Sequence, residues 1–209
     1  MTVDINQWIG LWPFAVLFIV VGVWGAYYFL APSGWREWTG AGLVQAFIIA
    51  LYAEMYGFPL TVYLLASLLP FEMPITESSG HLWSSLLGFG RLGAAVEAIV
   101  AWPLILFGML LIVKGWVRIY FLGDELVTSG IYGTIRHPQY AGIFLLIAGQ
   151  LVNWPTLPGI VLAPVIAWLY LGLAAREDRL LADRFGNAFE EYRSAVPRFV
   201  PRWKFFGSE

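Results

Sequence analysis

Long runs of apolar residues with almost no charges constrain this chain most strongly. The first run, residues 11–30, is uncharged and has the length that an α-helix needs to cross a bilayer core. Four further runs cover residues 40–69, 94–113, 138–152 and 157–175. The runs are continuous rather than alternating, which favours helices over barrel strands. The sequence therefore predicts an all-α fold: a polytopic membrane helix bundle of about five transmembrane helices.

The composition supports a membrane location and excludes several kinds of partner. Hydrophobic residues make up 59% of the 209 residues and charged residues only 12%, whereas soluble domains usually carry about 25% charged residues. A net charge of -2 gives no basic surface of the kind that nucleic acid requires. The chain has no cysteine, and its two histidines, His81 and His137, lie far apart. We therefore expect neither a nucleic-acid partner nor a metal site.

The positions of lysine and arginine predict the orientation of the spans. Basic residues concentrate in loops on the cytosolic side of membrane proteins. Only Arg91 falls on the other side in the predicted topology. An odd number of spans then places the N-terminus outside and the C-terminus in the cytosol, and we expect a bacterial inner membrane. The residues behind this orientation are Arg36, Lys114, Arg118, Arg136, Arg176, Arg179, Arg184, Arg193, Arg198, Arg202 and Lys204.

The chain is expected to have two parts. Residues 1–93 would form an N-terminal part with two spans and an external loop. Residues 94–209 would contain three spans, a cytosolic loop at 114–137, and a C-terminal helix and tail. Leu180, Leu181 and Phe185 follow the last span, which predicts a cytosolic amphipathic helix.

The end of the cytosolic loop has the features of a helix N-terminus. Pro138 suits the first helical position, and His137 would then be the cap. Free N–H groups at a helix N-terminus favour an anion, such as a carboxylate or phosphate, and Arg136 adds positive charge. An ordinary interfacial loop with a capped helix fits the same residues.

Two acidic residues are candidates for function. A carboxylate at Glu177, just past the last span, could bind an ammonium group or another cationic centre. A surface helix with an Arg179–Asp183 pair is the alternative interpretation. Glu54 lies inside an apolar run, where a carboxylate costs a few kcal/mol, so it should be neutral, paired or functional.

Two motif blocks in the C-terminal half resemble the isoprenylcysteine carboxyl methyltransferase family, whose superfamily includes the phospholipid N-methyltransferases. The family usually has two glutamates where this chain has Glu177 and Asp178. The first block is Gly130-Ile131-Tyr132 followed by Arg136-His137-Pro138-Gln139-Tyr140-Ala141-Gly142. The second is Glu177-Asp178-Arg179-Leu180-Leu181, then Phe185-Gly186, Tyr192 and Val196-Pro197-Arg198-Phe199-Val200-Pro201.

The resemblance implies an integral membrane methyltransferase with S-adenosyl-L-methionine as methyl donor. Methyl transfer requires alignment and exclusion of water more than acid–base groups. The acceptor would be a lipophilic small molecule or lipid: an isoprenylcysteine-like carboxylate, a lipid amine or a thiol. Expected catalytic residues are Arg176, Glu177 and Glu54. Expected cofactor-binding residues are Leu126, Val127, Gly130, Tyr132, Arg136, His137, Pro138, Tyr140 and Glu177.

Two other functions remain open from the sequence. One is an NADPH-dependent membrane reductase related to the sterol reductases, which would call for more basic residues near the loop. The other is a small transporter or scaffold without catalysis, in which Glu54 and Glu97 would mark a proton or cation path.

Overall fold

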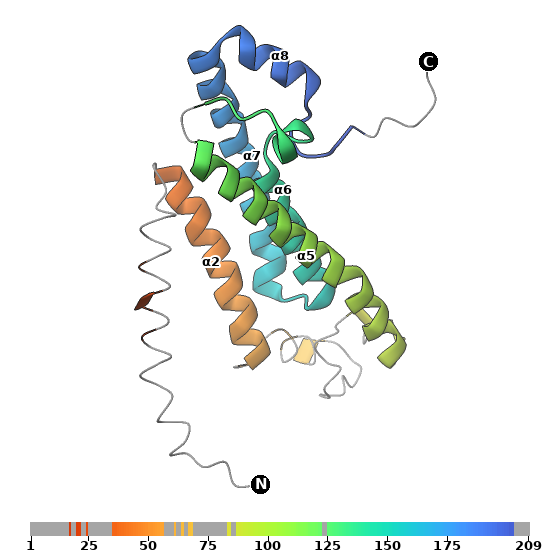
Figure 1. Ribbon diagram of the computed structural model, residues 1–209. Coiled ribbons are helices and arrows are strands. Elements are labelled where there is room, and N and C mark those ends of the chain that lie inside the picture. The colour runs from red at the N-terminus through yellow and green to blue at the C-terminus, as the bar shows by residue number, and fades with distance from the viewer. Residues whose placement is uncertain are drawn as a thin grey trace, which may run out of the picture. The chain divides into compact units, whose positions relative to one another are not determined.

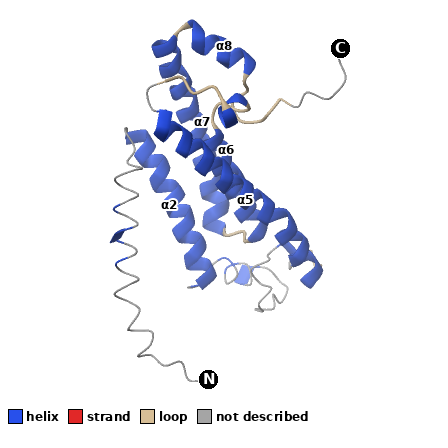
Figure 2. Ribbon diagram, viewed as in Figure 1, coloured by secondary structure: helices blue, strands red, loops and turns tan. Residues whose placement is uncertain are grey.

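The structure, a computed structural model, describes residues 35–56, 87–122 and 125–202, together with a few single positions at 17–24, 61–68 and 83–84. The chain divides into two compact units, Met1–Ala41 and Gly42–Glu209. All regular structure in the described residues is helical, as Figure 2 shows. The predicted all-α class is therefore confirmed. The functional division at residue 93 stays a prediction.

Six helical elements are described, and they follow the predicted spans in part. The predicted span at 138–152 coincides with a helix, whereas the span at 94–113 is the middle of a longer one. The predicted span at 11–30 lies almost entirely outside the described residues, so the number of five spans stays a prediction. The elements are α2 (Trp35–Tyr56), α5 (Gly90–Leu122), η1 (Gly130–Gly133), α6 (Pro138–Asn153), α7 (Leu157–Phe185) and α8 (Asn187–Ala195) (Figure 1).

Local sequence signals explain the turn between α6 and α7. The N–H of Trp154 donates to the carbonyl of Gln150 at 2.7 Å and closes the last turn of α6. Pro155 follows, and proline cannot continue a helix. The Thr156 side chain then accepts a 3.0 Å hydrogen bond from the Gly159 N–H, as an N-cap does. The predicted tight connection at 153–156 is present.

The last predicted helix is not separate from the last predicted span. Residues 176–185 continue α7, which ends where Gly186 adopts a φ of +54°. The short helix α8 begins directly after this glycine. Leu181 and Phe185 pack against a buried cluster of Phe189, Tyr192 and Val196. Two of the three predicted apolar residues thus contact α8, whereas Leu180 is 55% exposed.

Glycines allow α5 and α6 to approach closely, and this helix pair has the most extensive packing among the described elements. A Cβ atom at Gly142 would lie 2.5 Å from the carbonyl oxygen of Gly108. A Cβ atom at Gly149 would lie 2.7 Å from the side chain of Ile105. Small residues at such positions let helix backbones pack closely in membranes.

The outward faces of α5 and α7 are apolar. Both helices are long and apolar enough to cross a membrane, and only 28% of the most apolar stretch of each is buried. Leu92 on α5 and Trp168 on α7 are 81% and 75% exposed. Exposing so much apolar surface to water would be costly, whereas lipid accommodates it. The chain is a membrane protein.

Candidate functional site

The two motif blocks meet at the N-terminus of α6. His137 is the N-cap of this helix, Pro138 is its first residue, and both are buried. The N–H groups of Arg136 and His137 donate to the carbonyl oxygens of Pro197 and Arg198 at 2.9 and 3.1 Å. These hydrogen bonds join residues 196–202, the C-terminal tail, to the end of the loop before α6.

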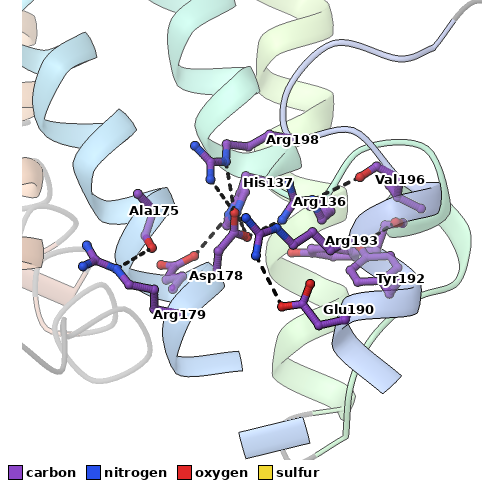
Figure 3. Close-up of polar contacts among 12 residues, drawn as sticks. Arg136, His137, Ala175, Asp178, Arg179, Glu190, Tyr192, Arg193, Val196 and Arg198 are labelled. Atoms are coloured by element: carbon purple, nitrogen blue, oxygen red, sulfur yellow. Dashed lines mark hydrogen bonds and ion pairs between the residues drawn. The ribbon is translucent and has the colours of Figure 1, made fainter. Parts of the chain in front are cut away.

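Asp178 on α7 forms the centre of this junction, as Figure 3 shows. One of its carboxylate oxygens, Oδ1, lies 2.9 Å from His137 Nε2 and 2.7 Å from Arg136 Nη1. The other, Oδ2, accepts hydrogen bonds from Arg198 Nε and Nη2 at 3.0 and 2.7 Å. The side chain is only 5% exposed. A buried carboxylate of this kind requires compensating partners, and here it has three.

Glu177 lies on the other side of the same imidazole ring. Its Oε2 is 3.2 Å from His137 Nδ1, and its Oε1 accepts a hydrogen bond from the Tyr140 hydroxyl. The Tyr140 ring is parallel to the His137 ring, with centroids 5.6 Å apart. Unlike Asp178, the Glu177 side chain is 40% exposed. The carboxylate is therefore oriented by two neighbours and still accessible to a ligand.

The surroundings of His137 favour its charged form. Burial acts to lower the pKa of the ring, but hydrogen bonds and charges from Asp178 and Glu177 outweigh it, so the pKa is raised. Both ring nitrogens face a carboxylate oxygen, and only an imidazolium has two N–H donors. His137 thus fits a role as a cationic anchor for the two carboxylates.

The loop before α6 is held by two tyrosines. The Tyr132 hydroxyl donates to the carbonyl of Gly115 on α5 at 3.1 Å. Its own backbone carbonyl accepts a 2.7 Å hydrogen bond from the Tyr192 hydroxyl. Burial is the main cause that raises the pKa of Tyr192 to about 12, so this hydroxyl stays protonated at neutral pH. The loop is thereby joined to α5 on one side and α8 on the other.

Replacing Tyr192 with phenylalanine is expected to destabilise the protein by about 1 kcal/mol, because the buried carbonyl of Tyr132 would lose its donor. Thermal unfolding in detergent measures the change. Phe189→Leu, which alters the same cluster without touching a hydrogen bond, separates lost packing from the lost bond. Equal stability of Tyr192→Phe and the wild type would contradict this assignment.

The structure brings most of the predicted site residues together. Leu126 packs against the buried cluster of Phe189, Tyr192 and Val196. Val127 precedes η1 in the same loop. Gly130 has a φ of +68°, and a Cβ atom there would lie 3.0 Å from the Arg118 guanidinium. The following sequence-predicted residues lie in η1, at the N-terminus of α6, or on α7 beside them: Tyr132, Arg136, His137, Pro138, Tyr140 and Glu177.

Two predicted catalytic residues are not part of this junction as described. Arg176 precedes Glu177 on α7, and its side chain is exposed. Glu54 lies in α2, but its side chain falls outside the part of the chain that the structure describes. Glu97, weighed as part of an ion path, is buried and accepts a hydrogen bond from the Ser84 N–H. That contact joins α5 to the backbone at Ser84.

The sequence prediction missed two residues of the junction, Asp178 and Arg198. Both residues stand in the second motif block, but neither is among the predicted site residues. The sequence did predict the path of the tail, because Pro197 and Pro201 end the helix and favour an extended segment able to fold back over a site.

Comparison with known proteins covers most of this junction but not the C-terminal tail. Residues 92–188 match the family model described as phospholipid methyltransferase. Together with isoprenylcysteine methyltransferases among the relatives, this match supports the isoprenylcysteine and phospholipid methyltransferase superfamily. The matched residues include most of α5, all of α6 and α7, and with them His137 and Glu177.

Individual relatives match over stretches of 77 to 99 residues. Protein-S-isoprenylcysteine O-methyltransferase of Schizosaccharomyces pombe is 32% identical over 77 residues, covering 36% of this chain and 33% of the relative. Protein-S-isoprenylcysteine O-methyltransferase B of Arabidopsis thaliana is also 32% identical, over 78 residues, covering 37% and 40%. A nickel-cobalt-cadmium resistance protein of Alcaligenes xylosoxydans xylosoxydans is 37% identical over 99 residues, covering 45% and 46%. The chain thus matches a third to just under half of each relative's length.

Proposed function

We propose that this protein is an integral membrane S-adenosyl-L-methionine-dependent methyltransferase that acts on a lipophilic or amphiphilic acceptor. The observation that carries the proposal is the accessible Glu177 carboxylate, oriented by His137 and Tyr140 where the two motif blocks meet. The superfamily assignment of residues 92–188 supports it. The isoprenylcysteine substrates in the names of two relatives make such a carboxylate one candidate acceptor.

The residues at the junction fit the chemical groups of the cofactor. A half-exposed carboxylate such as Glu177 suits an ammonium group, and cationic groups such as Arg136 suit a carboxylate. Tyr140 and Phe199 offer aromatic surface beside the His137 ring. When bound, S-adenosyl-L-methionine supplies a methyl group on a positively charged sulfur, which becomes a neutral thioether as the methyl moves to the acceptor.

The chain's own contribution would be binding, orientation and exclusion of water. His137 and Tyr140 fix the Glu177 carboxylate in one position, which lowers the entropy cost of holding a ligand. The C-terminal tail covers one side of the His137 ring, where Phe199 lies 5.8 Å from it. Arg176, exposed one residue before Glu177, is proposed to meet the acceptor. Glu54 is kept as a proposed catalytic residue on sequence grounds.

The proposed location is the bacterial inner membrane, with the N-terminus outside and the C-terminus in the cytosol. Both motif blocks would then lie on the cytosolic side. A water-soluble cofactor would reach them from the cytosol, while an apolar acceptor would arrive through the lipid. The charge distribution of the loops supports this orientation.

Replacing His137 with alanine is expected to weaken S-adenosyl-L-methionine binding about tenfold, or about 1.4 kcal/mol, because Glu177 would lose one of its two orienting partners. Isothermal calorimetry on the purified protein in lipid nanodiscs measures the dissociation constant. His81→Ala, the only other histidine variant that the chain allows, is the matched control and should bind as the wild type does.

Two results would count against the proposal. One is unchanged affinity in His137→Ala, and the other is folded wild-type protein that binds no S-adenosyl-L-methionine. Binding of NADPH instead would favour a reductase. If the cofactor binds, transfer of a labelled methyl group into lipid and thiol extracts identifies whether the acceptor atom is oxygen, nitrogen or sulfur.

A further inference from the structure

Asp178 makes more charged contacts than any other side chain at the junction, yet it is the carboxylate that a ligand can least reach. Its side chain is 5% exposed, compared with 40% for Glu177 next to it. Both oxygens are already engaged by His137, Arg136 and Arg198. Asp178 is therefore poorly suited to bind a cofactor directly. Its contacts suit a role in holding other residues.

The first group that Asp178 holds is the imidazole of His137. The Nε2 atom lies 2.9 Å from Asp178 Oδ1, and the opposite nitrogen, Nδ1, lies 3.2 Å from Glu177 Oε2. A neutral imidazole has one N–H, so it can donate to only one of these carboxylates. Loss of the proton would leave the other carboxylate facing a nitrogen lone pair. The position of Glu177 thus depends on the charge of His137.

The second group is the C-terminal tail. Arg198 donates two hydrogen bonds to Asp178 Oδ2, and the backbone of the tail pairs with Arg136 and His137. Phe199, the next residue, packs against His137 and against Phe144 of α6 with ring centroids 5.8 and 5.4 Å apart. One carboxylate therefore links the imidazole ring to the segment that covers it.

We propose that Asp178 is a positioning residue, which keeps His137 as an imidazolium that orients Glu177 and fastens the C-terminal tail over the same ring. This inference rests on the proposed function for its effect on cofactor binding. Its effect on His137 does not depend on any ligand.

The charged and titratable groups around the His137 ring determine whether a substitution raises or lowers the pH at which the ring loses its proton. Glu177 and Asp178 from α7 favour the imidazolium, whereas Arg136 beside the ring and Arg198 from the tail oppose it. Tyr140 from α6 stacks on the ring and donates its hydroxyl to Glu177. Removing the charge of Asp178 therefore lowers the pH at which His137 loses its proton. Removing the charge of Arg198 raises it.

Titration of His137 by nuclear magnetic resonance tests the first half of the inference. Protein with labelled histidine is prepared in a His81→Gln background, so that a single imidazole is observed. We expect His137 to titrate above the ordinary value of about 6.5. In Asp178→Asn the midpoint should fall by about one pH unit or more. Asp178→Glu, which restores the charge, should keep it above the ordinary value.

The same titration of His137 is carried out in Arg198→Gln, which serves as the test if Asp178→Asn fails to fold. This variant retains the contact between Asp178 and His137 and removes only a cation. The midpoint of His137 should then stay the same or rise. A fall of the midpoint in Arg198→Gln, or an unchanged midpoint in folded Asp178→Asn, would overturn the inference.

The pH dependence of S-adenosyl-L-methionine affinity tests the second half. In the wild type, affinity should fall as pH rises through the midpoint of His137, since Glu177 is then no longer fixed. In Asp178→Asn this fall should move to lower pH, and affinity at neutral pH should drop about tenfold. A loss of affinity that is the same at every pH would show a merely structural role and overturn the inference. A further outcome is that neither the wild type nor any variant binds the cofactor while His137 titrates as expected in each. In that case the proposed function fails, and the positioning role of Asp178 stands.

Discussion

Gly142→Ala is expected to destabilise the protein by about 1–3 kcal/mol, because the added methyl group has no space between α5 and α6. The new Cβ atom would lie 2.5 Å from the carbonyl oxygen of Gly108 and 3.0 Å from the backbone nitrogen of Ile112. Backbone atoms cannot rotate away as the end of a side chain can. The two helices must therefore move apart, which loosens the packing along their whole contact.

The matched control for this prediction is Gly172→Ala. A Cβ atom at Gly172, in α7, would have nothing within 4 Å. Alanine is the better helix former by about 1 kcal/mol, so Gly172→Ala should be neutral or slightly stabilising. Unfolding in a graded series of detergent mixtures compares both variants with the wild type. Similar changes at the two positions would contradict the close packing of α5 against α6.

How far the sequence predicted this fold depends on how local the signals are. The bounds of α6 were predicted within one residue, because Pro138 at the start and Pro155 after the end restrict the backbone by themselves. The end of α7 was not predicted correctly, because the hydropathy of the sequence falls after residue 175 whereas the helix continues. Residues 176–185 include three arginines and two leucines, which favour a helix without regard to lipid.

The same distinction explains which site residues were found. Motif spacing pointed to His137 and Glu177, and the structure brings them within 3.2 Å. It could not show which of the adjacent acids, Glu177 or Asp178, would be buried. Neighbouring positions on a helix point about 100° apart, and the packing of α6 and the tail against α7 decides which one faces inward. Arg198 lies 20 residues from Asp178 in sequence, so only the fold reveals their contact.

Asp178→Ala is expected to cost about 3–5 kcal/mol, the largest loss among these predictions, because it leaves buried cations without their carboxylate. Arg136, at 9% exposure, and His137, at 5%, would each lose a partner within 3 Å. Arg198 would lose both hydrogen bonds that fasten the C-terminal tail. Removal of one member of a buried charge cluster is costly since the others cannot regain water.

Asp183→Ala provides the matched control, since Asp183 is an exposed acid on the same helix. Its removal should change the free energy of unfolding by no more than about 0.5 kcal/mol. Limited proteolysis adds a local readout: Asp178→Ala should expose the tail to cleavage near residue 198 faster than Asp183→Ala does. Proteolysis measures release of the tail, and unfolding measures global stability, so the two effects are separated. If the tail stays protected in folded Asp178→Ala, the backbone hydrogen bonds of Arg136 and His137 are sufficient to hold it.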